Sequence, residues 1–284
     1  MLILAATDFS TRSNRALRQA GMLAQVGNVQ LHVVHVVDDD QPKELVCMEK
    51  REAERLLNEQ LNSMPELRGV QPRPMVLAGD PFDGILRAAA GVRADLIVMG
   101  SHRKQILLDI FIGTTIERVI RNGAFPILMV NNEAQRRYEE VLIPMDMSEA
   151  SATALRIAES TGLVGERRTT LLHAFWPVAE GRMFRGVNQA GGDEYVASER
   201  QSAMDGLAAF LVANNLGAGG WTLRIEDGGV MEVISRAVAE MRPDLLVMGM
   251  HERSGLLRMF IGSVTEEALR SLNIDILVVP PRRR

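Results

Sequence analysis

Short runs of Val, Ile, Leu and Met alternate along the chain with longer stretches in which apolar residues recur at helical spacing. The runs include LHVVHVV at 31–37, DLIVMG at 95–100 and PILMV at 126–130. Their nearly continuous apolar character is typical of strands buried on both faces. The stretches 11–25 and 42–64 are predicted to form amphipathic helices. Strands and helices that alternate in this way predict parallel βαβ units and an open doubly wound sheet of the α/β class.

The whole pattern occurs twice. Residues 3–24 match residues 141–162, and we expect five strands and four helices in each copy. We place the first domain at 1–132 and the second at 139–284, joined by the polar linker 131–140. The matched pairs separated by 138 positions are Asp8 with Asp146 and His35 with His173, and those separated by 149 are Gly79 with Gly228, Gly100 with Gly249 and Gly113 with Gly262.

The two spacings differ by 11 positions, so the second copy carries an insertion of that length between 173 and 228. The stretch GRMFRGVNQAGGDE at 181–194 is rich in Gly, Asn and Gln, which favour turns and loops. We therefore predict that the insertion is a loop at 181–194. The sequence does not indicate its role.

The composition is that of a soluble globular protein, with 46% hydrophobic and 24% charged residues. No apolar run is long enough to predict a membrane helix, and the opening MLILAATDFS is predicted to be a buried strand and not a signal peptide. The net charge of −4 argues against a nucleic-acid partner. The single Cys47 fits a reducing compartment, so a cytoplasmic location is expected, and the thiol is predicted to be packed in its helix.

A glycine, a hydroxyl and a glutamate recur at the start of the last helix of each copy, in GTTIE at 113–117 and GSVTE at 262–266. This spacing is typical of a capping box, in which the hydroxyls of Thr114 and Ser263 cap helices that carry Glu117 and Glu266 at their third position. A structural role would account for both stretches without a ligand.

The same atoms also suit an anion, because a helix N-terminus that follows a loop of small residues offers free N–H groups to a phosphate. Gly100 ends a predicted strand just before this loop, and Asp8 ends the first strand, from which it could hydrogen-bond a ribose. Ligands of open α/β sheets bind at these carboxyl ends. The sequence has neither a P-loop nor a dinucleotide-binding glycine motif.

Together with TDFS after the first strand, HVV in the second, MGSHRK and GTTIERVI, these features make each copy resemble a universal stress protein domain, and the chain a tandem universal stress protein. The resemblance implies the adenine-nucleotide α-hydrolase-like fold with strand order 3-2-1-4-5. It also implies that the last strands of the two copies pair, which makes one chain a pseudo-dimer.

The nucleotide-binding branch of that family carries the motif Gly-x2-Gly-x9-Gly-Ser/Thr, whereas another branch binds no nucleotide. The middle glycine is replaced by Arg103 in the first copy and by Glu252 in the second. Arg103 could supply charge to phosphates and Glu252 would repel them, which favours the first copy as the nucleotide site. The second copy retains Pro144, where the first has Ala6.

The resemblance also implies that Asp8 and Asp146 face the ribose or adenine and that Val36 and Ala174 lie near the base. The candidate nucleotide-binding residues are Thr7, Asp8, Val36, Gly100, Arg103, Gly113, Thr114 and Thr115 in the first copy, and Met145, Asp146, Ala174, Gly249, Gly262, Ser263 and Val264 in the second.

The remaining chemistry-bearing residues favour structural roles. His35 and His173 lie in predicted strands, where a packed, hydrogen-bonded imidazole is expected, and no histidines have metal-ligand spacing, so no metal is expected for folding. Asp80 is predicted to cap a helix, and Met248 and Met250 to fill core. No catalytic triad can be assigned.

Three functional hypotheses remain open at this point. The chain binds ATP or a related nucleotide as a regulatory ligand in a stress response, or it acts in that response through its surfaces without nucleotide, or it is a slow ATPase. The partners implied are the nucleotide, proteins that the sequence does not identify, and a second copy of the chain in a homodimer.

Overall fold

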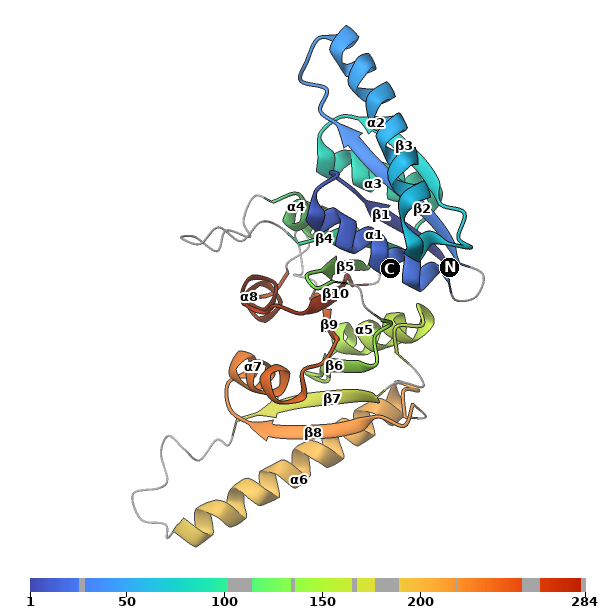
Figure 1. Ribbon diagram of the computed structural model, residues 1–284. Helices are drawn as coiled ribbons and strands as arrows, with labels where there is room; N and C mark the ends of the chain where they lie inside the picture. Colours follow the sequence, from blue (N-terminus) through green and yellow to red (C-terminus); the bar gives the residue numbers. More distant parts are fainter. Residues whose placement is uncertain are drawn as a thin grey trace. The chain divides into compact units, whose positions relative to one another are not determined.

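The computed structural model describes residues 1–25, 29–101, 114–133, 136–164, 168–176, 189–217, 219–251 and 261–281 (Figure 1). The chain divides into two compact units: unit 1 is Met1–Arg137 with Met250–Arg284, and unit 2 is Tyr138–Gly249. The last helix and strand of the second copy therefore belong to unit 1. None of the helices within the described ranges has the length and hydropathy needed to cross a bilayer.

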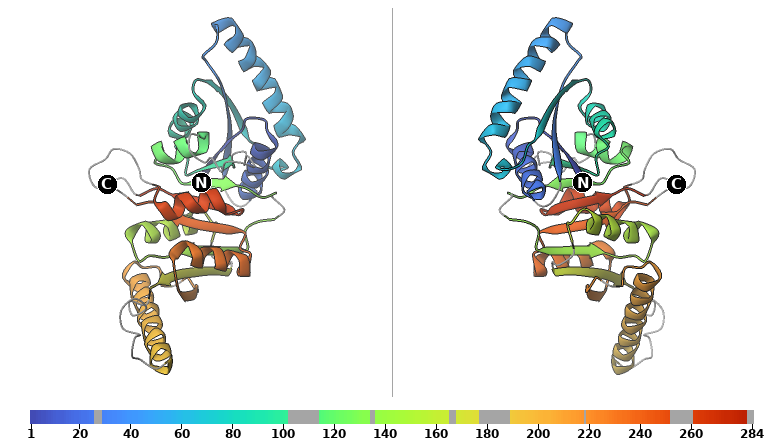
Figure 2. Two further views of the ribbon diagram at one scale, coloured as in Figure 1. Left: turned by 90° about the vertical axis from the view of Figure 1, so that its left-hand side faces the viewer. Right: turned by 90° about the vertical axis from the view of Figure 1, so that its right-hand side faces the viewer.

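Unit 1 alternates strands and helices as the sequence predicts, and the sheet is ordered β3-β2-β1-β4-β5-β10. Figure 2 shows α1 and α2 (blue) on one face of this sheet and α3 and α4 (green) on the other, as right-handed crossovers require. The expected strand order 3-2-1-4-5 is confirmed for the first copy. The elements are β1 (Leu2–Ala6), α1 (Thr11–Ala24), β2 (Gln30–Val37), α2 (Lys43–Ser63), the short 3₁₀ helix η1 (Pro65–Leu67), β3 (Arg73–Ala78), α3 (Pro81–Val92), β4 (Leu96–Gly100), α4 (Thr115–Asn122), β5 (Ile127–Val130), α8 (Ser263–Ser271) and β10 (Asp275–Val279).

The strands β1, β2, β4 and β5 pair in parallel, and their apolar runs are buried on both faces. Helix α1 begins after Ser10, whose hydroxyl accepts the N–H of Ser13, and α3 begins after Asp80, whose carboxylate accepts the N–H of Phe82. The predicted cap at Asp80 is therefore confirmed. Both helices start with a side chain that satisfies an otherwise unpaired N–H.

The last strands of the two copies pair antiparallel, as the resemblance implies. In the register, Leu128 lies opposite Leu277, Met129 opposite Ile276 and Ile127 opposite Val278. Leu277 is the repeat equivalent of Leu128, because they are 149 positions apart. The pairing is therefore symmetric about this leucine pair, as in an isologous dimer interface.

Unit 2 contains a sheet in the order β9-β6-β7-β8, which repeats the order of β4, β1, β2 and β3. All its strand pairs are parallel. Its buried residues include the predicted core side chain Met248, and Met250 is buried in unit 1. The elements are β6 (Glu140–Pro144), α5 (Glu149–Ser160), β7 (Arg168–Phe175), α6 (Gln189–Ala213), β8 (Thr222–Asp227), α7 (Val230–Met241) and β9 (Leu245–Gly249).

The stretch 181–194, where the insertion is predicted, ends in a helix. Residues 189–194 belong to the first turns of α6, so the prediction of a loop over 181–194 is wrong at its end, while 181–188 lie outside the described residues. If the second copy is aligned with the first at the offset of 138 positions, helix α6 begins eight positions later than α2. It is also four residues longer than α2, and its connection to the next strand is one residue shorter. Gln is a good helix former, so its presence in a Gly-containing stretch does not exclude a helix.

Cys47 is exposed, which overturns the prediction of a packed thiol. The buried residues of α2 are Ala53, Leu57 and Leu61, all at or beyond its midpoint. Cys47 lies nearer the beginning of the helix, and the side chains beside it, Leu45 and Met48, are exposed as well. The helical periodicity was correct, but it does not show how far along its length a helix contacts the sheet.

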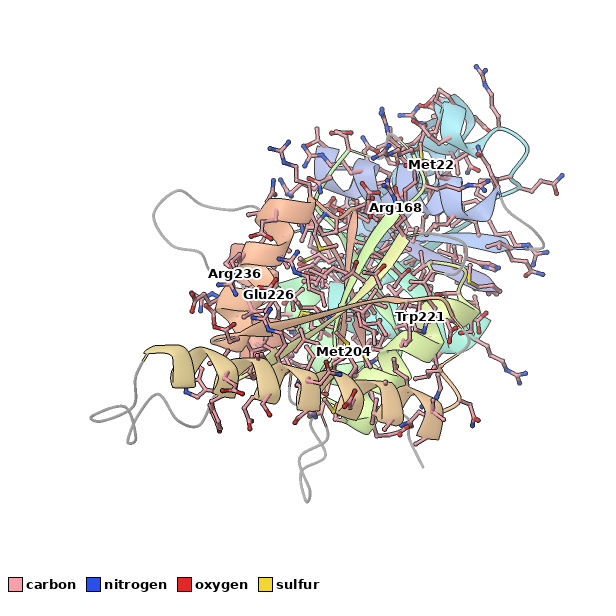
Figure 3. The ribbon with its side chains drawn as sticks, turned by 90° about the horizontal axis from the view of Figure 1, so that it is seen from below. Met22, Arg168, Met204, Trp221, Glu226 and Arg236 are labelled. Atoms are coloured by element: carbon pink, nitrogen blue, oxygen red, sulfur yellow. The ribbon has the colours of Figure 1, made fainter. Side chains whose placement is uncertain are left out.

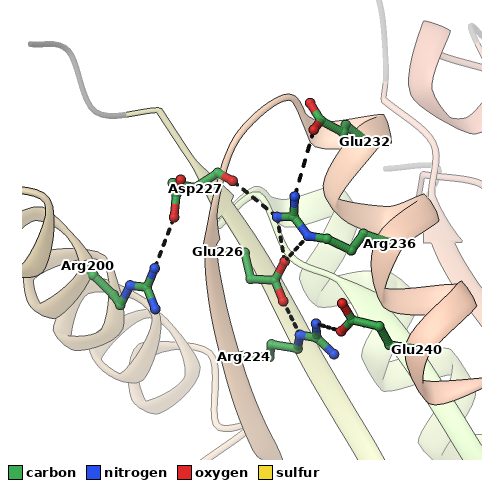
Figure 4. Close-up of polar contacts among 7 residues, drawn as sticks. All are labelled: Arg200, Arg224, Glu226, Asp227, Glu232, Arg236 and Glu240. Atoms are coloured by element: carbon green, nitrogen blue, oxygen red, sulfur yellow. Dashed lines mark hydrogen bonds and ion pairs between the residues drawn. The ribbon is translucent and has the colours of Figure 1, made fainter. Parts of the chain in front are cut away.

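Figure 3 shows Glu226 of the outer strand β8 beside Arg236 of α7 in unit 2. Glu226 of β8 accepts hydrogen bonds from Arg236 at 2.7 Å and from Arg224, and Arg224 also pairs with Glu240 (Figure 4). Burial opposes ionisation of Glu226, but the hydrogen bonds from its two arginines outweigh it and hold the pKa of this carboxyl below its usual value. Charges of this kind on an outer strand discourage pairing with another chain.

Candidate functional site

The carboxyl ends of β1, β2 and β4 surround a cavity of about 430 Å³ in unit 1. This volume lies within the range of small-molecule sites. Strand β1 lies between β2 and β4, so the cavity is at the point where the strand order reverses, the usual position of ligands in open α/β sheets.

Six candidates from the sequence line this cavity, namely Thr7, Asp8, Val36, Gly100, Thr114 and Thr115. Two others, Arg103 and Gly113, lie outside the described residues. The apolar part of the lining includes Val34, Ile85, Met99 and Ile116, which are aliphatic side chains suited to cover a flat base.

Asp8 lies in a tight turn that directs the chain from β1 into α1. Its Oδ1 accepts the N–H of Ser10 at 3.0 Å, and the following Phe9 has a φ of 61°. The second copy repeats this geometry, with Asp146 Oδ1 3.0 Å from the N of Ser148. A left-handed conformation costs energy for a residue other than glycine, and such strain is concentrated at functional sites and tight turns.

Asp8 remains ionised over a wide pH range. Partial burial opposes its ionisation, but hydrogen bonds with Ser10 and Ser13 outweigh this and lower the pKa of Asp8 from its ordinary value. The nearby charge of Arg12 acts in the same direction. The cavity therefore presents an acceptor, which suits hydroxyl groups better than anions.

His35 also lines the cavity, although the sequence suggested only a packed histidine. Its Nδ1 lies 2.9 Å from the carbonyl oxygen of Thr7. A carbonyl only accepts, so Nδ1 carries a proton and donates to it. In the second copy His173 Nδ1 bonds the carbonyl of Met145 at 2.7 Å, so the expectation of hydrogen-bonded histidines is confirmed for both.

Gly100 has a packing role that the motif alone did not reveal. A Cβ at this position would lie 2.5 Å from the carbonyl oxygen of Arg12, and at the equivalent Gly249 it would lie 2.4 Å from that of Ala150. Real Cβ atoms do not approach so closely, so only glycine lets the first helix of each copy start against its fourth strand. The same close approach brings Arg12 to the cavity.

The two copies cap their last helices differently. Thr114 caps α4, because its hydroxyl accepts the N–H of Glu117 at 3.2 Å. In the second copy the cap is Gly262, with a φ of 82°, and Ser263 is already helical. The predicted cap at Ser263 is therefore wrong. The positive φ lets the helix start one residue earlier, so the carbonyl of Gly262 accepts the N–H of Glu266.

The candidates of the second copy fall in different units. Met145, Asp146, Ala174 and Gly249 lie in unit 2, whereas Gly262, Ser263 and Val264 lie in unit 1. Glu252 is outside the described residues.

Arg12, Ser10 and Ser13 are cavity residues that the sequence reasoning missed. They lie in the stretch TDFSTRS, of which only Thr7 and Asp8 were candidates. Comparison of the copies could have found Arg12, because its repeat equivalent is Ala150. The described residues contain no cluster of His, Cys, Asp and Glu suited to a metal ion.

Comparison with known proteins agrees with the duplication. The model of the universal stress protein family matches residues 1–131 and again 137–280. A universal stress protein of Thermus aquaticus is 36% identical over 134 residues, which cover 45% of this chain and 96% of that protein. A universal stress protein of Mycobacterium bovis is 22% identical over 297 residues and spans 97% of this chain and 96% of its own length.

The architecture is also found among solved structures. The crystal structure of a universal stress protein from Archaeoglobus fulgidus superposes with a TM-score of 0.70 at 20% identity, covering 99% of this chain and 98% of that one. This similarity shows the tandem fold.

Proposed function

The chain belongs to the universal stress protein family, and on this premise we propose that its first copy binds ATP or a related nucleotide as a regulatory ligand in a cytoplasmic stress response. The cavity at the carboxyl ends of β1, β2 and β4 carries this proposal. It brings an ionised carboxylate, aliphatic side chains and the start of a helix into one space of suitable size.

Each part of a nucleotide has a matching group in the cavity. Val36 and Ile85 provide apolar surface for the base, and Asp8 can accept hydrogen bonds from ribose hydroxyls. Thr114 and Thr115 lie where α4 begins, and the free N–H groups of a helix start suit a phosphate.

The first test is to denature the purified protein and to chromatograph the supernatant for released nucleotide. Titration calorimetry with ATP then compares the wild type with Asp8→Asn. We expect Asp8→Asn to weaken ATP binding about tenfold or more, because it removes a charged acceptor. The matched control is Asp38→Asn: Asp38 accepts the N–H of Asp40 at 3.0 Å in a similar turn, but does not line the cavity.

Release of no nucleotide, together with no heat from ATP, would reject the proposal. Equal weakening by the two aspartate variants would also count against it, because the loss would then come from the turn and not from the ligand.

The second candidate is a stress-response interaction protein without nucleotide. It is favoured by the structural roles of the motif residues, since Gly100 permits helix packing and Thr114 caps α4. These roles would preserve both residues without a ligand. A negative result in the nucleotide test, followed by isolation of partner proteins, would support this alternative.

A further inference from the structure

We propose that Arg12 binds the phosphates of the nucleotide in the first copy, and that its replacement by Ala150 limits the chain to one nucleotide. The inference rests on the proposed function and adds to it the phosphate-binding group and the stoichiometry.

The position of Arg12 follows from the packing of α1 against β4. Arg12 is the second residue of α1, and its carbonyl oxygen lies against Gly100, the last residue of β4. Arg12 lines the same cavity as Asp8 and Thr114. The start of α1, which carries Arg12, is therefore on the β4 side of the cavity.

The order of strands across the sheet gives the cavity a direction. Val36 lies on β2, Asp8 follows β1, and Arg12 lies against β4, and the three strands are adjacent in that order. A nucleotide with its base beside Val36 and its ribose beside Asp8 would extend its phosphates toward Arg12. Base, sugar and phosphate thus meet apolar, anionic and cationic groups in sequence.

Among the described residues, the Arg12 guanidinium has no hydrogen-bonded or salt-bridged protein partner, although its charge acts on Asp8. Its neighbours on α1 differ: Arg15 donates to Glu133 at 2.7 Å, and Arg18 lies 3.8 Å from Glu66. An arginine at a cavity wall that is not hydrogen-bonded to a protein anion is available to a ligand, and its planar fork suits phosphate oxygens.

The second copy lacks this group at the equivalent position. The backbone of Ala150 makes the same close approach to Gly249 that Arg12 makes to Gly100, so the two residues are structural equivalents. Beside it, Glu149 replaces the neutral Thr11. The start of this helix therefore carries a positive charge in the first copy and a negative charge in the second, and the negative charge disfavours phosphate binding.

Titration calorimetry on the full chain with ATP and with adenosine tests the inference. We expect one equivalent of ATP for the wild type. Arg12→Ala should weaken ATP binding about 10- to 100-fold, because it removes charge-assisted hydrogen bonds to the phosphates. The affinity for adenosine, which has no phosphate, should stay within about twofold of the wild type. Arg18→Ala on the same helix is the control and should bind both ligands as the wild type does. Arg12→Gln, which keeps the length of the side chain, should repeat the effect if Arg12→Ala unfolds.

The possible failures are distinct. If the wild type binds ATP and both Arg12 variants bind it equally well, or lose adenosine to the same extent, the role of Arg12 is rejected while the proposed function stands. Two equivalents of ATP would reject the single site. If the wild type binds neither ATP nor adenosine, the proposed function fails and the inference fails with it.

Discussion

Glu117 and Glu266, the repeated glutamates of the two last helices, are bound by the same guanidinium. Arg121 lies 2.5 Å from Glu117 Oε1 through Nε and 3.1 Å from Glu266 Oε2 through Nη2. The side chain of Glu117 is only 7% exposed. The glutamates predicted for helix capping therefore also join α4 to α8 through one cation, next to the paired strands β5 and β10.

Replacing Arg121 by alanine should destabilise unit 1. The substitution removes charge-assisted hydrogen bonds to one buried and one half-buried carboxylate, so we expect a loss of about 1.5–3 kcal/mol in the free energy of unfolding. Urea unfolding measures it. The control is Arg55→Ala on α2: Arg55 pairs with Glu52 and Glu59 in solvent, so its loss should cost clearly less than the loss of Arg121. Equal costs would contradict the bridging role of Arg121.

Gly100→Ala should also destabilise the protein, because the new Cβ would lie 2.5 Å from the carbonyl oxygen of Arg12 and force α1 away from β4. We expect a cost of about 1–3 kcal/mol, typical of overpacking. Gly91→Ala is the matched control: Gly91 lies in α3, its Cβ would meet nothing within 4 Å, and alanine is the better helix former. Thermal unfolding of Gly100→Ala at the wild-type temperature would overturn this account.

The different caps of the two last helices predict unequal effects of the same substitution. Thr114→Ala removes the acceptor of the Glu117 N–H and should cost about 1 kcal/mol. Ser263→Ala should cost no more than about 0.5 kcal/mol, because Gly262 provides the cap and alanine suits the first turn of a helix. Denaturant unfolding of the two variants provides the comparison. A larger loss for Ser263→Ala would mean that its hydroxyl is the true cap.

Glu226→Gln should weaken the protein in a pH-dependent way. The folded pKa of Glu226 is below its ordinary 4.5, so its contribution to stability is fully present above that value and is lost as pH falls through the folded pKa. We expect the free energy of unfolding to fall by about 1–2 kcal/mol at neutral pH, because charge-assisted hydrogen bonds are lost. The difference from the wild type should shrink in acid.

Urea unfolding at neutral and acid pH measures this difference. Glu232→Gln is the control, because Glu232 is 73% exposed and lies 3.8 Å from Arg236. A difference between wild type and Glu226→Gln that is independent of pH would contradict the role of the charge.

The periodicity of the sequence was sufficient to predict the α/β class, the duplication and the helix starts at Asp80 and Thr114, because these depend on local pattern. The exposure of Cys47 could not be predicted, since it depends on where α2 leaves the sheet. The cap at Gly262 depends on one backbone angle, which a capping motif does not determine.

For the site, the motif identified residues at the ends of β1, β2 and β4 that the fold brings around one cavity. It did not identify Arg12, because the glycine motif at 100–114 does not extend to residue 12. It also did not show that Gly100 is required by its contact with the backbone of α1. Contacts between elements distant in sequence become visible only in three dimensions.

The symmetric register of β5 and β10 has an evolutionary consequence. In a homodimer of identical subunits, every substitution at such an interface appears on both sides of the axis. Here the gene duplication has freed the two sides to diverge: Asp275, whose Oδ1 accepts the N–H groups of Asn131 and Asn132, is aligned with Pro126 in the first copy. The carboxylate of the second copy thus needs no counterpart in the first copy, and each copy can acquire substitutions independently of the other.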